Sequence, residues 1–183
     1  CKDVNLILRN GDIIAELRDE VQRGKYDVTI IGGSQKRGMA HNLVQYIDSS
    51  IFVVKNYNQE QSYSLLLPVN DSPHTPKAVK YGARVAQAFD IKVNLITVSK
   101  TESFGESYTQ ASNRASKLMR RVGIDHERHF KTGDPVEVIK KTVGDNHIVV
   151  MGASTKNPLL KFFVGSKPLK VMEDCQCPIL IVK

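Results

Sequence analysis

The chain has 183 residues and a formal net charge of +7, with 41% hydrophobic and 25% charged residues. This composition allows a hydrophobic core and excludes wholesale disorder. No apolar run approaches the ~18 residues that a membrane-spanning helix needs. Three cysteines are too few for a disulfide scaffold, so we expect a globular protein of the cytoplasm.

The positive charge lies in residues 61–183, because residues 1–60 carry equal numbers of basic and acidic side chains. The densest basic cluster is Lys117, Arg120 and Arg121, on a predicted helix without interleaved aromatic residues or a nucleic-acid-binding signature. We therefore interpret the charge as a cationic bias of the solvated surface, and we expect no nucleic acid partner.

Short runs rich in Val, Ile and Leu recur along the chain, and most are continuously apolar, as in parallel strands that are covered on both faces. Between them lie segments with helical spacing or helix-start signals, which predict helices over Thr75–Phe89, over Tyr108–Val122 and from Asp134-Pro135 to about Val143. This alternation predicts an α/β fold with a doubly wound parallel sheet. In chain order the apolar runs are Val4–Leu8, Val28–Ile31, Ile51–Val54, Ser64–Val69, Val93–Val98, Ile148–Met151 and Ile179–Val182.

The chain also repeats itself. Residues 4–31 and 126–154 each contain a predicted strand, a Gly-Asp turn, a helix and a strand that ends in glycine, and each copy then continues to a similar closing strand. The two copies are 122 residues apart at the turn and 128 apart at the closing strand. Two strand–helix modules precede the turn in the second copy and none in the first, so we expect roughly 60 residues of matching chain before Cys1.

We therefore interpret residues 1–56 as the C-terminal half of a degenerate first repeat, residues 57–61 as a polar linker, and residues 62–183 as a complete five-stranded, Rossmann-like domain. The closing strands, residues 51–54 and 179–182, are apolar enough that we expect them to pair across a pseudo-two-fold axis, or to mediate self-association of the chain.

Three features of residues 62–183 resemble the universal stress protein family. The segment Val69-Asn70-Asp71-Ser72 follows the first strand, where the family usually has Val-Asp-x-Ser. Gly152 ends the fourth strand and Gly165-Ser166 follows thirteen residues later, which matches the outer spacing of Gly-x2-Gly-x9-Gly-Ser/Thr in ATP-binding members. Cys177-Pro178 leads into a closing strand of the usual kind. The chain is identified as a tandem universal-stress-like protein that lacks its beginning.

The resemblance implies an adenine nucleotide, ATP with Mg, at the carboxyl ends of the strands, with phosphate oxygens at a helix N-terminus. The residues implied in binding are Asn70, Asp71, Ser72, Val98, Met151, Gly152, Ser154, Gly165, Ser166 and Lys167.

The sequence departs from the binding pattern at three positions. Asn70 replaces the family's Asp and loses its charge, Thr155 replaces the middle glycine, and Pro168 stands where the family often has Ser or Thr. Conversely, Lys156 and Lys167 add positive charge beside the expected phosphate site.

Nothing in the sequence indicates catalysis or a complete metal site. There is no Gly-x-Ser-x-Gly elbow and no P-loop, His126 and His129 lie at an odd separation on one strand, and Cys175 and Cys177 supply only two thiolates. Two functions stay open: a nucleotide-binding sensor of the stress response, or a nucleotide-free dimerisation or regulatory module. Either could belong to a longer chain that also holds a membrane transporter.

Overall fold

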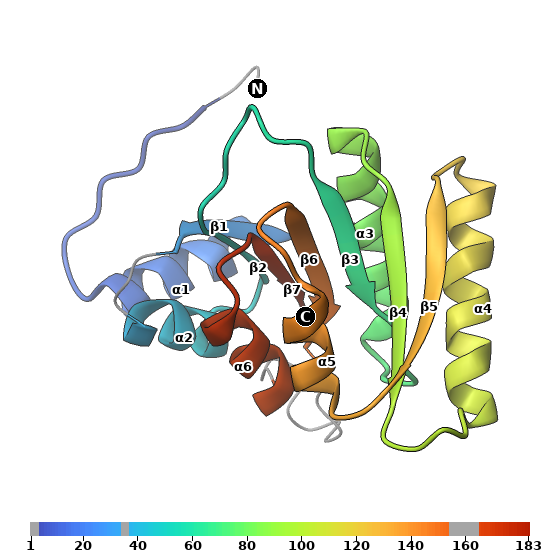
Figure 1. Cartoon of the computed structure of the whole chain (residues 1–183). Coiled ribbons are helices and arrows are strands. Elements are labelled where there is room, and N and C mark those ends of the chain that lie inside the picture. Colours follow the sequence, from blue (N-terminus) through green and yellow to red (C-terminus); the bar gives the residue numbers. More distant parts are fainter. Residues whose placement is uncertain (1–3, 34–36, 154–164) are drawn as a thin grey trace.

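Residues 4–33, 37–153 and 165–183 are described by the computed structural model, and within them seven strands form one sheet in the order β1-β2-β7-β6-β3-β4-β5 (Figure 1). The strands are β1 (Val28–Gly32), β2 (Ser50–Val54), β3 (Ser64–Pro68), β4 (Val93–Ser99), β5 (His126–Thr132), β6 (His147–Gly152) and β7 (Ile179–Val182). The helices are α1 (Ile13–Gly24), α2 (Arg37–Tyr46), α3 (Thr75–Phe89), α4 (Glu106–Arg121), α5 (Pro135–Thr142) and α6 (Ser166–Asp174).

Strands β3 to β7 form the predicted doubly wound parallel unit. β3 pairs in parallel with both β4 and β6, β4 pairs with β5, and β6 pairs with β7. The chain runs outward from β3 through β4 to β5 and then returns to β6 on the other side of β3. The strand order therefore switches between β3 and β6, which is where α/β sheets of this kind bind ligands.

The N-terminal strands extend this sheet. β1 pairs in parallel with β2, and β2 pairs with β7 in the antiparallel sense, with Ile51 opposite Ile181 and Val53 opposite Ile179. All four of these isoleucine and valine side chains are fully buried. The two predicted closing strands thus lie side by side within one chain.

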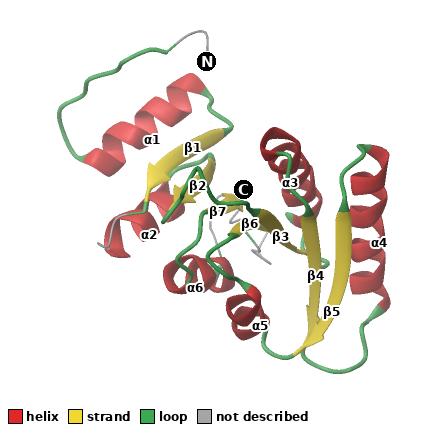
Figure 2. Ribbon diagram, turned by 45° about the horizontal axis from the view of Figure 1, so that its top comes forward, coloured by secondary structure: helices red, strands yellow, loops and turns green. Residues whose placement is uncertain are grey.

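Helices cover the two faces of the sheet unequally (Figures 1 and 2). α3 and α4 pack on one face, where Ala83, Ala115 and Met119 join the core beneath them. The other face carries α1, α2, α5 and α6, whose buried side chains share one cluster. No helix among the described residues is both long and apolar enough to cross a membrane.

Local sequence signals explain several element boundaries. α3 spans the predicted residues, with Pro76 in its first turn, where a missing N–H costs nothing. α5 begins after Asp134, whose carboxylate accepts hydrogen bonds from the backbone N–H groups of Val136 (2.9 Å) and Glu137 (3.2 Å).

The predicted strand Val4–Leu8 is wrong. These residues have no regular structure, and Val4, Leu6 and Leu8 are 83%, 85% and 86% exposed. An apolar run becomes a strand only when a neighbouring strand takes up its backbone hydrogen bonds. Among the described residues no strand pairs with residues 4–8, and the next residue, Arg9, forms ion pairs with Glu16 and Glu20 of α1.

Two buried threonines give opposite predictions for stability. Thr97 of β4 is fully buried, and its hydroxyl has no hydrogen-bond partner among the described residues, whereas the hydroxyl of Thr75 donates to Asn70 Oδ1 at 2.7 Å. Thr97→Val keeps the shape and removes a desolvated hydroxyl, so we expect it to raise the free energy of unfolding by about 1 kcal/mol. Thr75→Val should lower it by about 1 kcal/mol. Urea denaturation measures the free energy of unfolding of both variants. A change of the same sign in both would contradict the assignment of Thr97 as unpaired and Thr75 as hydrogen-bonded.

Lys183 makes stability depend on alkaline pH. Its side chain is only 7% exposed and donates to the carbonyl of Ile47, and burial lowers the pKa of its ammonium group to about 8. The folded chain therefore releases this proton near pH 8, while the unfolded chain holds it until about pH 10.4. The unfolded state binds more protons in this window, so the free energy of unfolding should rise by about 2 kcal/mol between pH 8 and pH 10.

Denaturation curves of the native chain and of Lys183→Met, measured across this window, test the prediction. Other lysines and the tyrosines titrate equally in both proteins, so the difference between the two profiles isolates Lys183. Parallel profiles would show that its ammonium group is solvated in the folded state.

Candidate functional site

A pocket of about 80 Å³ opens at the carboxyl ends of β3 and β6, where the strand order switches. Six segments contribute to its wall: the end of β3 with the loop into α3, the end of β4, the first turn of α4, α5, the end of β6, and α6. Its lining residues are Pro68, Val69, Asn70, Ser72, Thr75, Ile96, Val98, Tyr108, Pro135, Val136, Ile139, Met151, Gly152, Lys167, Pro168 and Val171.

Six of the predicted binding residues line this pocket together, although they come from four separate segments of the chain: Asn70, Ser72, Val98, Met151, Gly152 and Lys167. Asp71 does not line it; its carboxylate is exposed and accepts a hydrogen bond from Ser107 Oγ at 3.3 Å. Gly165 and Ser166 immediately precede Lys167 at the start of α6. Ser154, Thr155 and Lys156 lie outside the described residues.

The side chain of Asn70 builds the turn that starts α3. Its amide oxygen accepts hydrogen bonds from Ser72 N (3.0 Å) and Thr75 Oγ1 (2.7 Å). An amide oxygen has two lone pairs, so these bonds fill its acceptor capacity. The amide nitrogen, in contrast, makes no hydrogen bond to the described residues. Position 70 therefore presents a donor where a carboxylate would present an acceptor.

Gly152 is required by packing against α3. A Cβ at this position would lie 2.9 Å from His74 Cβ and 3.2 Å from the backbone carbonyl of His74. Burial and the nearby Lys77 lower the pKa of His74, the residue that precedes α3. The glycine that the sequence singles out for ligand approach thus has a structural role in joining β6 to the start of α3.

The N-terminus of α6 stands beside the pocket. Gly165 is its N-cap residue, no side chain among the described residues caps its first turn, and Lys167 reaches the pocket wall from that turn. Gly165 N donates to Ala153 O at 2.7 Å, so a backbone hydrogen bond joins the end of β6 to the start of α6. Uncapped N–H groups, the helix dipole and a lysine together favour an anion at this point.

Sequence reasoning missed the residues that complete the hydrophobic side of the pocket. Tyr108 comes from α4, and Val136 and Ile139 come from α5. The Asp134-Pro135 signal correctly marked the start of α5, but nothing local indicates that this helix packs against α6 and β4. Only the crossover connection from β5 to β6 brings it there.

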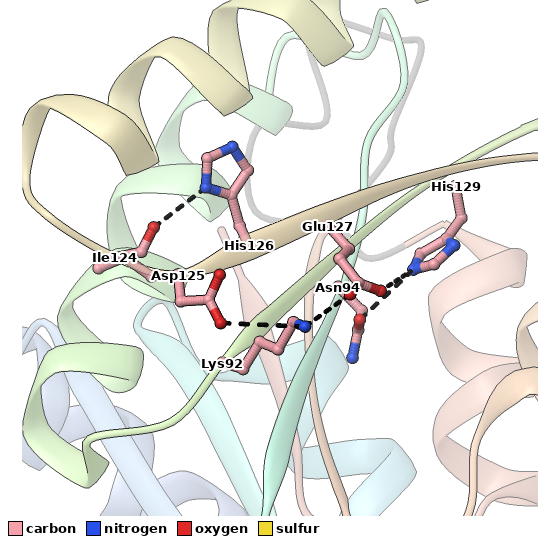
Figure 3. A network of polar contacts seen from close by, with 7 residues as sticks. All are labelled: Lys92, Asn94, Ile124, Asp125, His126, Glu127 and His129. Carbon is pink, nitrogen blue, oxygen red and sulfur yellow. Dashed lines mark hydrogen bonds and ion pairs between the residues drawn. The ribbon is translucent and has the colours of Figure 1, made fainter.

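The other titratable residues form separate surface networks. His126 Nε2 contacts Ser116 Oγ of α4 (2.8 Å), while His129 Nε2 lies 3.4 Å from Asn94 Oδ1 and 3.6 Å from Glu127 Oε2. The two rings thus contact different elements, as their odd separation on β5 predicts (Figure 3). In the described part of the chain, no group of three His, Cys, Asp or Glu side chains could hold a metal ion.

The two C-terminal cysteines are buried thiols. Burial raises the pKa of Cys175, and it raises the pKa of Cys177 to about 12. Because the thiolate is the nucleophile and the metal ligand, both side chains act as packing groups at neutral pH.

Comparison with known proteins connects this architecture to one family. Residues 64–183 match the Universal stress protein family. A universal stress protein of Methanocaldococcus jannaschii is 25% identical over 147 residues, which cover 69% of this chain and 85% of the relative.

Solved structures share the fold. A universal stress protein from Archaeoglobus fulgidus has a TM-score of 0.68 and 16% identity, over 94% of this chain and 66% of its own, so the chain spans about two thirds of that structure. Another universal stress protein structure from A. fulgidus, a complex with dAMP, has a TM-score of 0.53 and 16% identity, over 66% of this chain and 98% of its own.

The family match covers the whole parallel unit that carries the pocket, from the first residue of β3 to the end of the chain. It also spans more than half of the 183 residues. The chain belongs to the universal stress protein family.

Proposed function

We propose that residues 62–183 bind an adenine nucleotide, ATP with Mg, and act as a non-catalytic sensor of the stress response. The observation that carries this proposal is the pocket at the strand-order switch, where Asn70, Gly152 and Lys167 meet beside the uncapped N-terminus of α6. The dAMP complex of the related A. fulgidus protein supports the ligand class.

The proposal assigns different ends of the nucleotide to different walls. The apolar side chains of Val98, Val136 and Met151 suit a base, and the start of α6 with Lys167 suits phosphate oxygens. The pocket volume of about 80 Å³ is below the ~300 Å³ of typical ligand sites, so it accounts for part of a nucleotide only. The rest of the ligand would extend toward the solvent side of α6.

A calorimetric titration with MgATP tests the proposal directly. Gly165 has φ −65° and ψ 161°, which any L-residue adopts, so neither Gly165→Ala nor Gly165→Val strains the backbone. We expect saturable binding to the native chain, a small loss for Gly165→Ala and a loss of at least about tenfold for Gly165→Val, whose branched side chain obstructs the start of α6.

Two outcomes would argue against a nucleotide at this site. One is the absence of heat up to millimolar MgATP while circular dichroism shows a folded protein. The other is unchanged affinity in Gly165→Val, which would move the nucleotide away from α6.

Position 70 offers a gain-of-function variant. The carboxylate of Asn70→Asp can accept the same bonds from Ser72 N and Thr75 Oγ1, and it has further lone pairs for a ligand. A hydrogen bond to a charged group contributes about 1.5–3 kcal/mol, so we expect nucleotide affinity to rise about tenfold. Titration of both proteins at neutral pH measures the change. Equal affinities would exclude residue 70 from ligand contact.

The alternative is a nucleotide-free module that works by pairing surfaces, and the contacts around β2 and β7 favour it. Lys55 Nζ donates to the carbonyls of Met172 and Cys175 at the end of α6 (2.9 Å for Cys175), and Lys183 Nζ donates to the carbonyl of Ile47 just after α2. Lysine side chains suit the exposed carbonyls at helix C-termini.

These contacts also support the tandem organisation that we propose for the chain, with residues 1–56 as a partial first repeat. Lys183 is 128 residues after Lys55, and Cys175 is 128 residues after Ile47, the same offset as the closing strands. The last lysine of each copy thus donates to carbonyl groups at the equivalent helix end of the other copy.

We further propose that such a tandem acts in the cytoplasm, either alone, as a self-associated dimer, or as the cytosolic part of a membrane transporter. The full-length sequence distinguishes these: a multi-span segment upstream supports the transporter, and a start codon roughly 60 residues upstream excludes it.

A further inference from the structure

The positive charge of the molecule is concentrated on two helices. α3 carries Lys77, Lys80 and Arg84 and no acidic residue, and α4 carries four basic residues against the single carboxylate of Glu106. These two helices therefore hold a net charge of +6, out of +7 for the whole chain. They pack side by side on the same face of the sheet (Figure 2).

These basic side chains lack carboxylate partners in the part of the chain that the structure describes. Of the seven basic side chains on α3 and α4, none forms an ion pair within the described residues, although Lys77 and Arg84 each lie 5.8 Å from the ring centroid of Tyr81. Lys80 and Arg114 have neither kind of partner there. Leaving this many like charges unpaired on adjacent helices disfavours the compact state, unless an anion offsets them.

A cavity of about 490 Å³ lies between the two helices, under Lys80 and Arg114. The space exists because α4 presents small side chains, Ala111 and Ala115, toward Val79 of α3. Its volume falls within the roughly 300–1,000 Å³ of small-molecule sites.

We infer that this α3/α4 cavity binds a small amphipathic anion: an organic acid with an apolar body, such as a fatty or aryl carboxylate. The apolar body contacts Val79, Ala111, Ala115 and Leu118, and the acid group pairs with Lys80 and Arg114. The carboxylate of Asp71 also lines the cavity, where it accepts a hydrogen bond from Ser107, two turns of α4 before Arg114, so the proposal places the acid group at the other, cationic end. Apolar walls provide the hydrophobic contribution, and two cations that would otherwise stay unpaired provide charge-assisted hydrogen bonds. The inference does not depend on nucleotide binding, because its ligand occupies the outer side of the α3 turn.

The positive charge alone would also suit binding to a nucleic acid or a membrane surface, but the geometry favours a small ligand. A polyanion would engage all seven cations along both helices, and its affinity would depend on their total number. An acid bound in the cavity depends on the two cations that line it. The two cases differ in which lysines and arginines matter.

Calorimetric titration with decanoate, below its micelle concentration, tests the inference on the whole chain. We expect saturable binding with one site per chain. Lys80→Gln/Arg114→Gln should weaken it about tenfold or more. The matched control is Lys117→Gln/Arg121→Gln, which removes the same charge from exposed positions of α4 outside the cavity, and should change affinity less than about twofold.

A second variant probes the volume and leaves every charge in place. Ala111→Phe places an aromatic ring in the cavity and should abolish decanoate binding, with thermal unfolding used to verify that the variant is folded. Displacement of anilinonaphthalene sulfonate by decanoate provides an independent readout. The inference is overturned if the native chain binds no decanoate, if both double variants weaken binding equally, or if a folded Ala111→Phe variant binds as well as the native chain.

Discussion

The antiparallel pairing of β2 with β7 is the contact on which the rest of the structure depends. Without it the seven-stranded sheet would divide into a parallel unit of five strands and an isolated pair, and two-stranded sheets are marginal in water. The pairing buries apolar side chains on both strands and brings α2 into one core with α6. The pairing therefore contributes to stability through its own hydrogen bonds and through the hydrophobic core that it closes on one face of the sheet.

Polar contacts at the ends of these strands reinforce the same arrangement. Lys55 and Lys183 each leave the sheet and reach carbonyl groups at a helix end in the opposite part of the chain. A buried ammonium group is costly unless several acceptors surround it, and this cost appears as the lowered pKa of Lys183. Such a group stabilises one relative position of the two strands, because any slip would leave the charge buried without acceptors.

Features that depend on residues close together in the sequence could be predicted, whereas features that depend on contacts between distant segments could not. α3 was predicted at its observed bounds because its apolar spacing lies within the segment itself and its start signal, Asp71-Ser72-Pro73, lies just upstream. Residues 4–8 have an equally strong apolar pattern, but a strand also needs a neighbour, and the segment itself contains no information about one. The glycine spacing located the end of β6 and the start of α6, whereas the contribution of α5 to the pocket depends on how the crossover places that helix.

The same distinction applies to individual residues in the site. Sequence comparison marks Asn70 as a lost charge, and Gly152 as a position where a ligand approaches. The structure adds that the oxygen of Asn70 is already engaged by Ser72 and Thr75, and that Gly152 is packed against His74. Both residues therefore help to hold the start of α3 in place.

The turn from Asn70 to Thr75 has a further consequence, because it forms a wall of two cavities. Asn70, Ser72 and Thr75 line both the pocket at the strand-order switch and the cavity between α3 and α4. The hydrogen bonds that Asn70 Oδ1 accepts from Ser72 N and Thr75 Oγ1 hold this shared wall together. The amide nitrogen of Asn70 makes no hydrogen bond to the described residues, so position 70 presents a donor at a wall that both cavities share, where a carboxylate would present an acceptor.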